Sequence, residues 1–478
     1  MINLIPTPND IQMSGERVAL APHCSAPKAF ANAATTLRDY ALRVHSIEIS
    51  EGTGAIEFEL DSTLEYEGYR IEVSESGAKV YAADVLGAQN AAVSLIQLIE
   101  KQGESLTLPI GTISDRPECS WRGFMIDLAR NWHDISMLYE YVDMCRFYKV
   151  KYLHIHFTDD QSYTLPSKAF PKLSTEGRSY TEDEIRGLIA YSKLRGVEII
   201  PEVDAPGHTA CFGAAYGEIF GKNGIICQSD ESMRGMETIY RELCELFSDS
   251  EYVHIGGDEA YNIPKWTTCP KCLEVYRRAG IDLDAMEQRE REEFMYATFL
   301  KKICDIILDC GKIPVMWEGF SKDCNDRLPK DLTVFAWESL YQLAPDLQEG
   351  GFPLLNASWK PLYVCNPKKM WGPEEILDWE KTRWQNWWDQ SPASRQPINL
   401  AHDAPVDGGQ MCSWGDHMTL RSAYAPRPQM IAEEFAAVAH RLPALSEKLW
   451  NSYSKPDKAA FVYNLKVSTD LLYRMLSK

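Results

Sequence analysis

From residue 121 onward, strand-length apolar runs alternate with amphipathic segments, and this alternation constrains the fold more than any other feature of the sequence. It is the pattern of parallel β-α units, in which a helix follows each strand and covers the sheet. Helical spacing is clearest at 138–145 and 431–442. The candidate strands span 123–126, 152–157, 198–203, 252–255, 313–317, 333–337, 354–357 and 410–414. Eight such units predict an α/β protein with a (β/α)8 TIM barrel.

The first part of the chain has a different pattern. Short alternating stretches at 56–60 and 69–73, with a helical pattern over 83–99, predict a small α+β module. Turn residues interrupt the periodicity near 113–117, which places a domain boundary there. The 478 residues then divide into a supporting α+β domain over 1–118 and a catalytic barrel with a C-terminal helical extension over 119–478.

One long stretch of the barrel region, 359–409, has only weak periodicity. Its tryptophans include Trp371, Trp379, Trp384, Trp387 and Trp388. An irregular excursion of this length in a barrel is usually functional, so we expect it to shape the mouth of a pocket.

The composition disfavours several classes of protein. A hydrophobic content of 45% with 25% charged residues is ordinary for a soluble chain, and no apolar run reaches the roughly 18 residues of a membrane span. A formal net charge of −20 disfavours nucleic acid as a partner, because phosphate binding needs clustered Lys and Arg. The first residues lack the basic start and apolar core of a signal peptide, so we expect a cytoplasmic location and leave a homo-oligomer open.

The thirteen cysteines are odd in number and scattered, which predicts reduced, buried thiols rather than a disulfide framework. Cys269-Pro270-Lys271-Cys272 has the spacing of half a zinc site. No second Cys or His pair follows at zinc-ribbon distance. We therefore predict a loop with two free thiols and no metal.

Polar side chains accumulate where the first four candidate strands end, at 127–130, 158–160, 204–208 and 254–259. Each group, taken alone, is better explained as a helix cap or an Arg-carboxylate brace. Barrel active sites, however, lie at the C-terminal ends of the strands. Acids, a His and an Arg at four successive strand ends therefore indicate a site.

The last of these groups contains adjacent carboxylates, Asp258 and Glu259, after Gly256 and Gly257. Neighbouring side chains of a strand point to opposite faces, so the two acids serve one site only where extended geometry has ended. The glycines supply that break. One interpretation is that the pair supplies a catalytic acid and a residue that assists it. The other is that the pair caps the N-terminus of a helix, where the macrodipole favours negative charge.

Three later strands end in tryptophan followed by an acid: Trp317-Glu318, Trp337-Glu338 and Trp414-Gly415-Asp416. Aromatic faces offer flat apolar area to the C–H face of a pyranose, and carboxylates accept hydrogen bonds from its hydroxyls. Any one tryptophan could instead fill the barrel core. Three at the same end of the barrel favour a sugar-binding box.

The motif His254-x-Gly256-Gly257-Asp258-Glu259 resembles the signature of the family 20 glycoside hydrolases, the exo-acting β-N-acetylhexosaminidases, and the resemblance extends over 121–450. It implies that Glu259 is the general acid and that Asp258 orients the acetamido group of the substrate. The implied reaction is retaining and substrate-assisted, through an oxazolinium ion, with no metal or organic cofactor. The implied partner is a terminal β-linked N-acetylglucosamine or N-acetylgalactosamine of a glycan.

The resemblance also implies substrate-binding residues. Arg130 matches the arginine that holds the C3 and C4 hydroxyls of the terminal sugar, and Tyr363 matches the tyrosine bonded to the acetamido oxygen. The matching pocket-wall positions are Asp159, His208 and His254. The matching aromatic wall is Trp317, Trp337 and Trp414.

Three positions depart from the family pattern. Cys365 follows Tyr363-Val364 where the family commonly has Asp, and Asp416 stands where the family has Glu. Both positions contact the C4 and C6 side of the sugar in the family, so the choice among gluco, galacto and substituted N-acetylhexosamines is open. Tyr163 stands where a tryptophan is frequent, so the loop after the second strand can differ in shape.

Two other functions are compatible with parts of the pattern. His154-x-His156 places two rings on one strand face, as in metal-dependent amidohydrolases, although those sites need further ligands that the sequence does not identify. A non-catalytic sugar-binding barrel is the second alternative, and it would be expected to lack Asp258 or Glu259.

Overall fold

The eight candidate strands are confirmed as one closed parallel barrel in the computed structural model, which describes residues 3–365, 370–415 and 428–476. The barrel strands are β9 (Trp121–Asp127), β10 (Tyr152–His156), β13 (Glu198–Glu202), β14 (Tyr252–His254), β15 (Ile313–Trp317), β16 (Thr333–Ala336), β17 (Leu354–Asn356) and β21 (Val406–Ser413). Neighbours pair in parallel, and β21 closes the sheet because it pairs with both β9 and β17.

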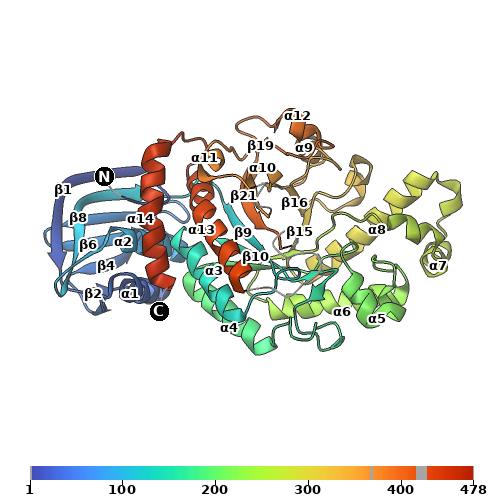
Figure 1. The fold of residues 1–478 in the computed structure, drawn as a ribbon, viewed down its shortest axis with the longest axis horizontal. Coiled ribbons are helices and arrows are strands. Elements are labelled where there is room, and N and C mark those ends of the chain that lie inside the picture. The colour runs from blue at the N-terminus through green and yellow to red at the C-terminus, as the bar shows by residue number, and fades with distance from the viewer. Residues whose placement is uncertain (1–2, 366–369, 416–427, 477–478) are drawn as a thin grey trace.

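Helices surround the barrel, as the amphipathic spacing predicts (Figure 1). The predicted helix at 138–145 is α3 (Ile135–Phe147), whose Leu138, Tyr141 and Val142 are buried. The one at 431–442 is α13 (Pro428–Trp450). The others include α4 (Glu182–Arg195), α5 (Ala210–Phe220), α6 (Asp230–Leu246), α7 (Pro270–Arg278), α8 (Gln288–Asp309) and α9 (Ala344–Glu349).

Aromatic rings fill the interior of the barrel. At the end where the strands begin, Trp121 stacks on Tyr152 with ring centroids 4.1 Å apart. Nearer the strand ends, the rings of His254 and Trp317 lie 4.7 Å apart. These side chains are almost completely buried, so the barrel has a solid core, and a ligand can enter only at its rim.

The stretch 359–409 is built from short pieces. These are α10 (Trp359–Leu362), β18 (Tyr363–Val364), α11 (Pro373–Ile376), β19 (Arg383–Trp384), α12 (Pro392–Arg395) and β20 (Ile398–Asn399). β18 extends the barrel sheet beside β21, and β19 pairs with β20. Trp384 is fully buried, and its indole N–H donates to Ala336 O at 2.9 Å, which fixes the excursion to the end of β16.

The N-terminal part is an α+β domain, as predicted. Its sheet contains β1 (Asp10–Leu20), β2 (His23–Ser25), β3 (Ser50–Glu51), β4 (Ile56–Leu60), β5 (Tyr69–Ser74), β6 (Gly77–Ala82), β7 (Glu100–Gln102) and β8 (Ser105–Asp115). The predicted helix is α2 (Val85–Leu98), whose N-cap residue Asp84 accepts the Gly87 N–H at 2.9 Å. α2 packs on β5, β6 and β8, and α1 (Ala31–His45) packs on α2.

The last helix, α14 (Lys458–Leu476), connects the two parts of the molecule. It contacts α1 of the N-terminal domain and both α3 and α13 of the barrel (Figure 1). The Arg43 guanidinium of α1 donates to Met475 O at 2.9 Å. Within the described residues, no helix combines the length and apolar character needed to cross a membrane.

Candidate active site

The Gly256-Gly257 turn places the two adjacent acids at the rim of the barrel. β14 ends at His254, and the glycines follow with φ of 72° and 89°. A Cβ on Gly256 would lie 1.7 Å from Asp204 Oδ1, and one on Gly257 would lie 2.4 Å from Met316 Cε, so only glycine fits at either position. Glu259 then adopts φ of 43°, a conformation that a non-glycine residue keeps only when its surroundings hold it.

Asp258 and Glu259 face a pocket at the C-terminal ends of the barrel strands. The residues that line it lie in or follow β9, β13, β14, β15, β16, β17, β18 and β21, and three of the four polar strand ends of the sequence, all except 158–160 after β10, contribute to the lining. The lining is Arg130, His208, Asp258, Glu259, Trp317, Trp337, Trp359, Tyr363, Cys365 and Trp414.

His208 connects the acid pair to a third carboxylate, that of Asp159. Its Nε2 lies 3.2 Å from Glu259 Oε2 and 3.9 Å from Asp258 Oδ2, and its Nδ1 lies 3.3 Å from Asp159 Oδ1. Burial disfavours a charged imidazole, but the charge of Asp159 and its hydrogen bond outweigh burial and raise the pKa of His208 well above its usual value. An imidazolium therefore lies between Asp159 and Glu259.

Arg130 is held at the opposite side of Asp159. One guanidinium nitrogen lies 2.6 Å from Asp159 Oδ2 and another 3.0 Å from Asp127 Oδ2. Burial favours the neutral Asp159 carboxyl, but the charges of Arg130 and His208 outweigh it, and its pKa lies well below the usual range. Two carboxylates thus fix the guanidinium at the pocket, which is the arrangement needed to hold hydroxyl groups in one orientation.

The two adjacent acids have opposite tendencies to bind a proton. Burial, reinforced by the charge of Glu259 and opposed by His208, raises the pKa of Asp258 to about 6. Glu259 is more exposed, and although its partial burial favours protonation, the hydrogen bond and charge of His208 lower its pKa below the usual value. The two carboxylates therefore titrate in different pH ranges although they are adjacent in the sequence.

The aromatic residues form a wall on the other side of the pocket. The rings of Trp337 and Tyr363 are parallel within 2°, with centroids 6.1 Å apart. The indole of Trp337 is fixed by a 2.8 Å hydrogen bond to Glu318 O, and that of Trp317 by a 2.7 Å bond to Glu202 Oε1. The Arg130 guanidinium lies over Trp414, 5.3 Å from the centroid of the ring. Rings held this rigidly offer a preformed surface to a sugar.

Two of the residues matched to the pocket wall do not line the pocket. His254 is fully buried beneath the acid pair, where its Nδ1 accepts the Gly256 N–H at 3.0 Å and so braces the turn. Asp159 is 1% exposed and acts through Arg130 and His208. Both residues lie behind the lining, and the wall position expected for them stays a prediction. Asp416 lies outside the described residues.

Several residues at the site were not predicted as part of it. Trp359 lines the pocket and packs edge-on against Trp387, with centroids 5.3 Å apart, whereas Trp379 and Trp384 are buried in the excursion. Tyr261 is 66% exposed at the rim, and its hydroxyl donates to Glu259 Oε1 at 3.0 Å. The sequence offered one signal for Tyr261, which is an aromatic residue two positions after the candidate acid Glu259.

The histidine pair considered as metal ligands instead bonds to a buried carboxylate, Glu202. His154 Nε2 and His156 Nδ1 lie 3.0 Å and 2.6 Å from Glu202 Oε2, and His254 Nδ1 lies 3.0 Å from Glu202 Oε1. These groups could in principle surround a cation. They are sealed beneath the pocket, however, and Glu202 already bonds the Trp317 indole, so a substrate cannot reach them. The amidohydrolase alternative is not favoured.

The fold and the site define a (β/α)8-barrel enzyme with a carboxylate pair in an aromatic pocket, a combination typical of glycoside hydrolases. The model described as the catalytic domain of glycosyl hydrolase family 20 matches residues 119–452, and that of domain 2 of the same family matches residues 1–116. The chain belongs to glycoside hydrolase family 20.

Known proteins resemble most of the chain in sequence and nearly all of it in fold. A beta-hexosaminidase of Akkermansia muciniphila is 31% identical over 82% of this chain and 78% of its own length. The beta subunit of human beta-hexosaminidase is 26% identical over 81% of this chain and 66% of its own length. The fold superposes on an exo-β-N-acetylglucosaminidase of Vibrio harveyi with a TM-score of 0.81, at 21% identity, over 99% of this chain and 77% of that one.

Proposed function

We propose that the protein is a retaining exo-β-N-acetylhexosaminidase that removes terminal β-linked N-acetylglucosamine or N-acetylgalactosamine. The observation that carries this proposal is the adjacency of Asp258 and Glu259. Among the described residues that line the pocket, these two are the only carboxylates, and both come from one turn. A retaining enzyme with a protein nucleophile needs carboxylates about 5 to 5.5 Å apart that flank the scissile bond. Family 20 is the exception, because the substrate's acetamide attacks instead.

In the proposed reaction, Glu259 protonates the glycosidic oxygen while the acetamide oxygen attacks C1. The C1–oxygen bond breaks, an oxazolinium ion forms, and the aglycone leaves with the proton. Glu259, now a carboxylate, deprotonates water, which attacks C1 from the face that the aglycone left and restores the acetamide with net retention. The proton taken from water restores the acid for the next turnover, and His208 Nε2, 3.2 Å from Glu259 Oε2, orients the carboxyl group.

Asp258 stabilises the charge that develops on the acetamide N–H. It is 7% exposed, and its buried Oδ1 has no hydrogen-bond partner among the described residues, so the carboxylate can turn toward a substrate N–H without losing a hydrogen bond from that oxygen. In so buried a site an ionised carboxylate interacts strongly with a developing positive charge. Tyr363, 2% exposed on the aromatic wall, is the proposed partner of the acetamide oxygen.

Arg130 is the proposed anchor of the C3 and C4 hydroxyls, and Trp317, Trp337 and Trp414 are the proposed apolar surface under the sugar ring. Cys365 also lines the pocket, and a thiol is a weaker hydrogen-bonding group than a carboxylate. Discrimination at C4 and C6 is therefore proposed to be weak, so that gluco and galacto substrates differ by about tenfold or less in kcat/KM.

Hydrolysis of chromogenic β-N-acetylglucosaminide tests the proposal, with the galactosaminide, the 6-sulfated glucosaminide and plain β-glucoside assayed beside it. We expect turnover of the N-acetylated substrates, β-configured product in the first minutes by NMR, and almost no turnover of the glucoside, which lacks the nucleophile. Comparable rates on the glucoside, or α-configured product, would contradict substrate assistance.

A further inference from the structure

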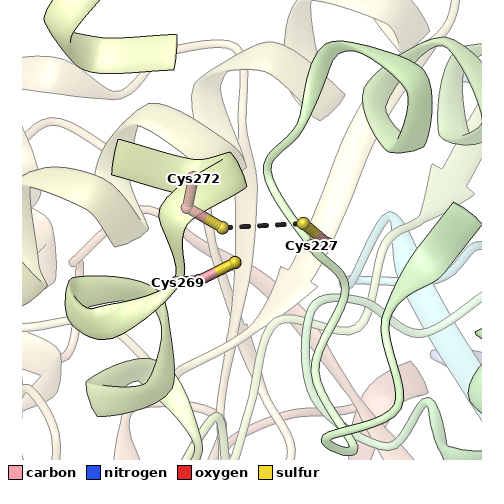
Figure 2. A group of neighbouring side chains, drawn as sticks. All are labelled: Cys227, Cys269 and Cys272. Atoms are coloured by element: carbon pink, nitrogen blue, oxygen red, sulfur yellow. Dashed lines mark hydrogen bonds between the residues drawn. The ribbon is translucent and has the colours of Figure 1, made fainter. Parts of the chain in front are cut away.

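Three cysteines outside the active site lie together, and two of them belong to the motif that gave an incomplete metal pattern in the sequence. Cys269 is the N-cap residue of α7, and Cys272 lies in its first turn. Cys227, from the segment between α5 and α6, supplies a third thiol. Figure 2 shows the sulfur atoms of all three directed toward one another. Both cysteines of the motif are free thiols, and folding places a third free thiol beside them.

The geometry of the cluster fits a tetrahedral ion. Cys227 Sγ and Cys272 Sγ are 3.6 Å apart, and the three sulfurs all lie within 4.8 Å of one another. Tetrahedral zinc with Zn–S bonds of about 2.3 Å requires sulfurs about 3.8 Å apart. A disulfide, by contrast, requires sulfurs about 2.05 Å apart. Small side-chain rotations would bring the three sulfurs onto one ion.

The surroundings favour thiolates. The Gln228 N–H donates to Cys272 Sγ at 3.3 Å, and the α7 N-terminus contributes its positive dipole end. Cys272 is fully buried and Cys269 is half-buried, so the cluster has a dry inner side and an outer side that solvent reaches.

We propose that Cys227, Cys269 and Cys272 form a zinc site with three thiolate ligands and a water molecule in the fourth position. The three sulfurs come from two segments that carry the catalytic groups. The chain after β13 includes His208 and continues through α5 to Cys227. The chain after β14 includes Glu259 and continues to Cys269 and Cys272.

The same segments are already joined beside the cluster. The Trp266 indole donates to Ile226 O at 2.8 Å, and Lys265 Nζ donates to Asn223 O at 2.9 Å. A bound ion would strengthen this connection, and because it binds only the folded site, it would stabilise the native state. The role is structural, since the cluster does not line the substrate pocket.

The test uses full-length protein without a histidine tag, purified under reducing conditions without chelator. Elemental analysis is expected to find about one zinc per chain, and replacement by Co²⁺ is expected to give thiolate-to-cobalt charge-transfer absorption with the visible bands of a tetrahedral ion. Cys269→Ser changes a half-buried ligand and is expected to lose the zinc, whereas Cys310→Ser, a half-buried thiol outside the cluster, is expected to keep it.

Chelation is expected to lower Tm by several degrees, reversibly on zinc addition, while turnover in short assays below the transition is unchanged. Three results would overturn the proposal: fully reduced wild type with neither zinc nor the cobalt spectrum, zinc retained in Cys227→Ser, Cys269→Ser and Cys272→Ser alike, or a Cys227–Cys272 disulfide that persists when zinc is in excess under reducing conditions. The cobalt spectrum is measured on wild type, so a variant that fails to fold does not decide the outcome.

Discussion

At the scale of single residues, the site separates two chemically similar carboxylates by their surroundings. Asp258 is buried with an unpaired oxygen, whereas Glu259 is partly exposed and hydrogen-bonded to His208 and Tyr261. One acid is therefore placed to complement a positive charge, and the other is placed to exchange a proton. The Gly256-Gly257 turn orients both side chains, so the two acids could exchange roles only if the turn moved.

Glu259→Gln is expected to lower kcat/KM by about 10² to 10⁴ for substrates with poor leaving groups, because only these need a proton from the acid. Aryl substrates with strongly activated leaving groups should lose little in the first chemical step. Steady-state kinetics on a chitobiose-type disaccharide and a dinitrophenyl glycoside measure the difference. The exposed Glu290→Gln serves as control, and an equal loss on both substrates would argue against Glu259 as the acid.

Asp258→Asn is expected to lower kcat by about 10² or more, with a smaller change in KM, because the lost charge acts mainly in the transition state. A thiazoline analogue of the oxazolinium ion should bind wild type tightly and the variant weakly. Titration calorimetry with that analogue measures the difference. Trapping of a covalent adduct on Asp258 by a 2-fluoro glucoside would instead show an ordinary double displacement.

The pH dependence of kcat/KM follows from the same carboxylate. Asp258 must be ionised to stabilise the oxazolinium N–H, and its pKa is raised to about 6, so activity should fall as pH decreases through about 6. Asp258→Asn should show no such acid limb, although its activity is lower throughout. Initial rates between pH 4 and 8 test this. If the variant kept the same acid limb, the loss of activity at low pH would belong to another group.

Residues that line the pocket could be predicted from the sequence, but their support could not. Asp258, Glu259, His208 and Arg130 lie within six residues after the ends of their strands, so strand order brings them together. Glu202 lies within an apolar strand, and its contacts with three histidines exist only after the barrel closes. Likewise, no sequence spacing relates Cys227 to the α7 cysteines, since 42 residues separate Cys227 from Cys269.

At the scale of elements, strands were easier to predict than the stretch between β17 and β21. Most barrel strands contain a short apolar run, which is visible in the sequence, whereas β21 reads VDGGQMCS and begins four residues before the predicted strand. The stretch 359–409 is held by single long-range bonds, such as that between Trp384 and Ala336 O, which leave no periodic signal. Its tryptophan content and the match at Tyr363 indicated a function, and the residues of this stretch that line the pocket are Trp359, Tyr363 and Cys365.

Glu318 illustrates how one element positions another. Its carboxylate accepts the backbone N–H groups of Trp337, Ser339, Leu340, Tyr341 and Gln342 at 2.9 to 3.4 Å, and so fixes the segment after β16. That segment carries Trp337 of the aromatic wall and Tyr341, whose hydroxyl lies 3.4 Å from that of Tyr261. A single buried acid therefore orients part of the sugar surface without touching the pocket.

Glu318→Gln is expected to loosen the segment after β16, because the amide NH₂ group cannot accept the N–H donors that one carboxylate oxygen now accepts. We expect KM to rise several-fold with a smaller change in kcat, and stability to fall by about 1 to 3 kcal/mol. Steady-state kinetics and urea unfolding measure both. Asp346→Asn, which disrupts an exposed ion pair with Lys322, should change neither, and a Glu318→Gln enzyme with unaltered KM would remove the positioning role.

At the scale of the whole molecule, the N-terminal domain is attached to the barrel by buried polar groups. Asp115, at the end of β8, accepts the Trp450 indole N–H at 2.7 Å and bonds Lys149 Nζ at 3.1 Å. Glu67 forms an ion pair with Arg122 at the start of β9, and the two side chains are 1% and 2% exposed. These buried ion pairs fix the orientation of the N-terminal domain on the barrel, because separating the partners would leave each charge buried without a counter-charge. The domain therefore supports the barrel from the end remote from the substrate.

Glu67→Gln is expected to destabilise the whole protein, not the N-terminal domain alone. Arg122 keeps bonds to Lys149 O at 3.0 Å and Cys119 O at 2.7 Å but loses its counter-charge in a buried site, which costs about 3 kcal/mol, the lower end for a broken buried pair. Burial favours the neutral Glu67 carboxyl, yet the Arg122 and Lys151 charges lower its pKa below the usual value. Its stabilising contribution is therefore complete above the unfolded pKa of about 4.3 and is lost as pH falls through the lower folded pKa.

Urea unfolding at pH 7 and at pH 4, followed by circular dichroism and by tryptophan fluorescence, tests this expectation. Both probes should report one transition that shifts to lower urea in Glu67→Gln at pH 7, with a smaller shift at pH 4. Glu59→Ala is the matched control, because Glu59 and Lys79 are both about half exposed, and such a surface pair contributes about 1 kcal/mol or less. If the N-terminal domain instead unfolded in a separate early transition and the barrel midpoint stayed constant, the buried pair would stabilise only the domain that carries it, and the barrel's stability would be independent of docking.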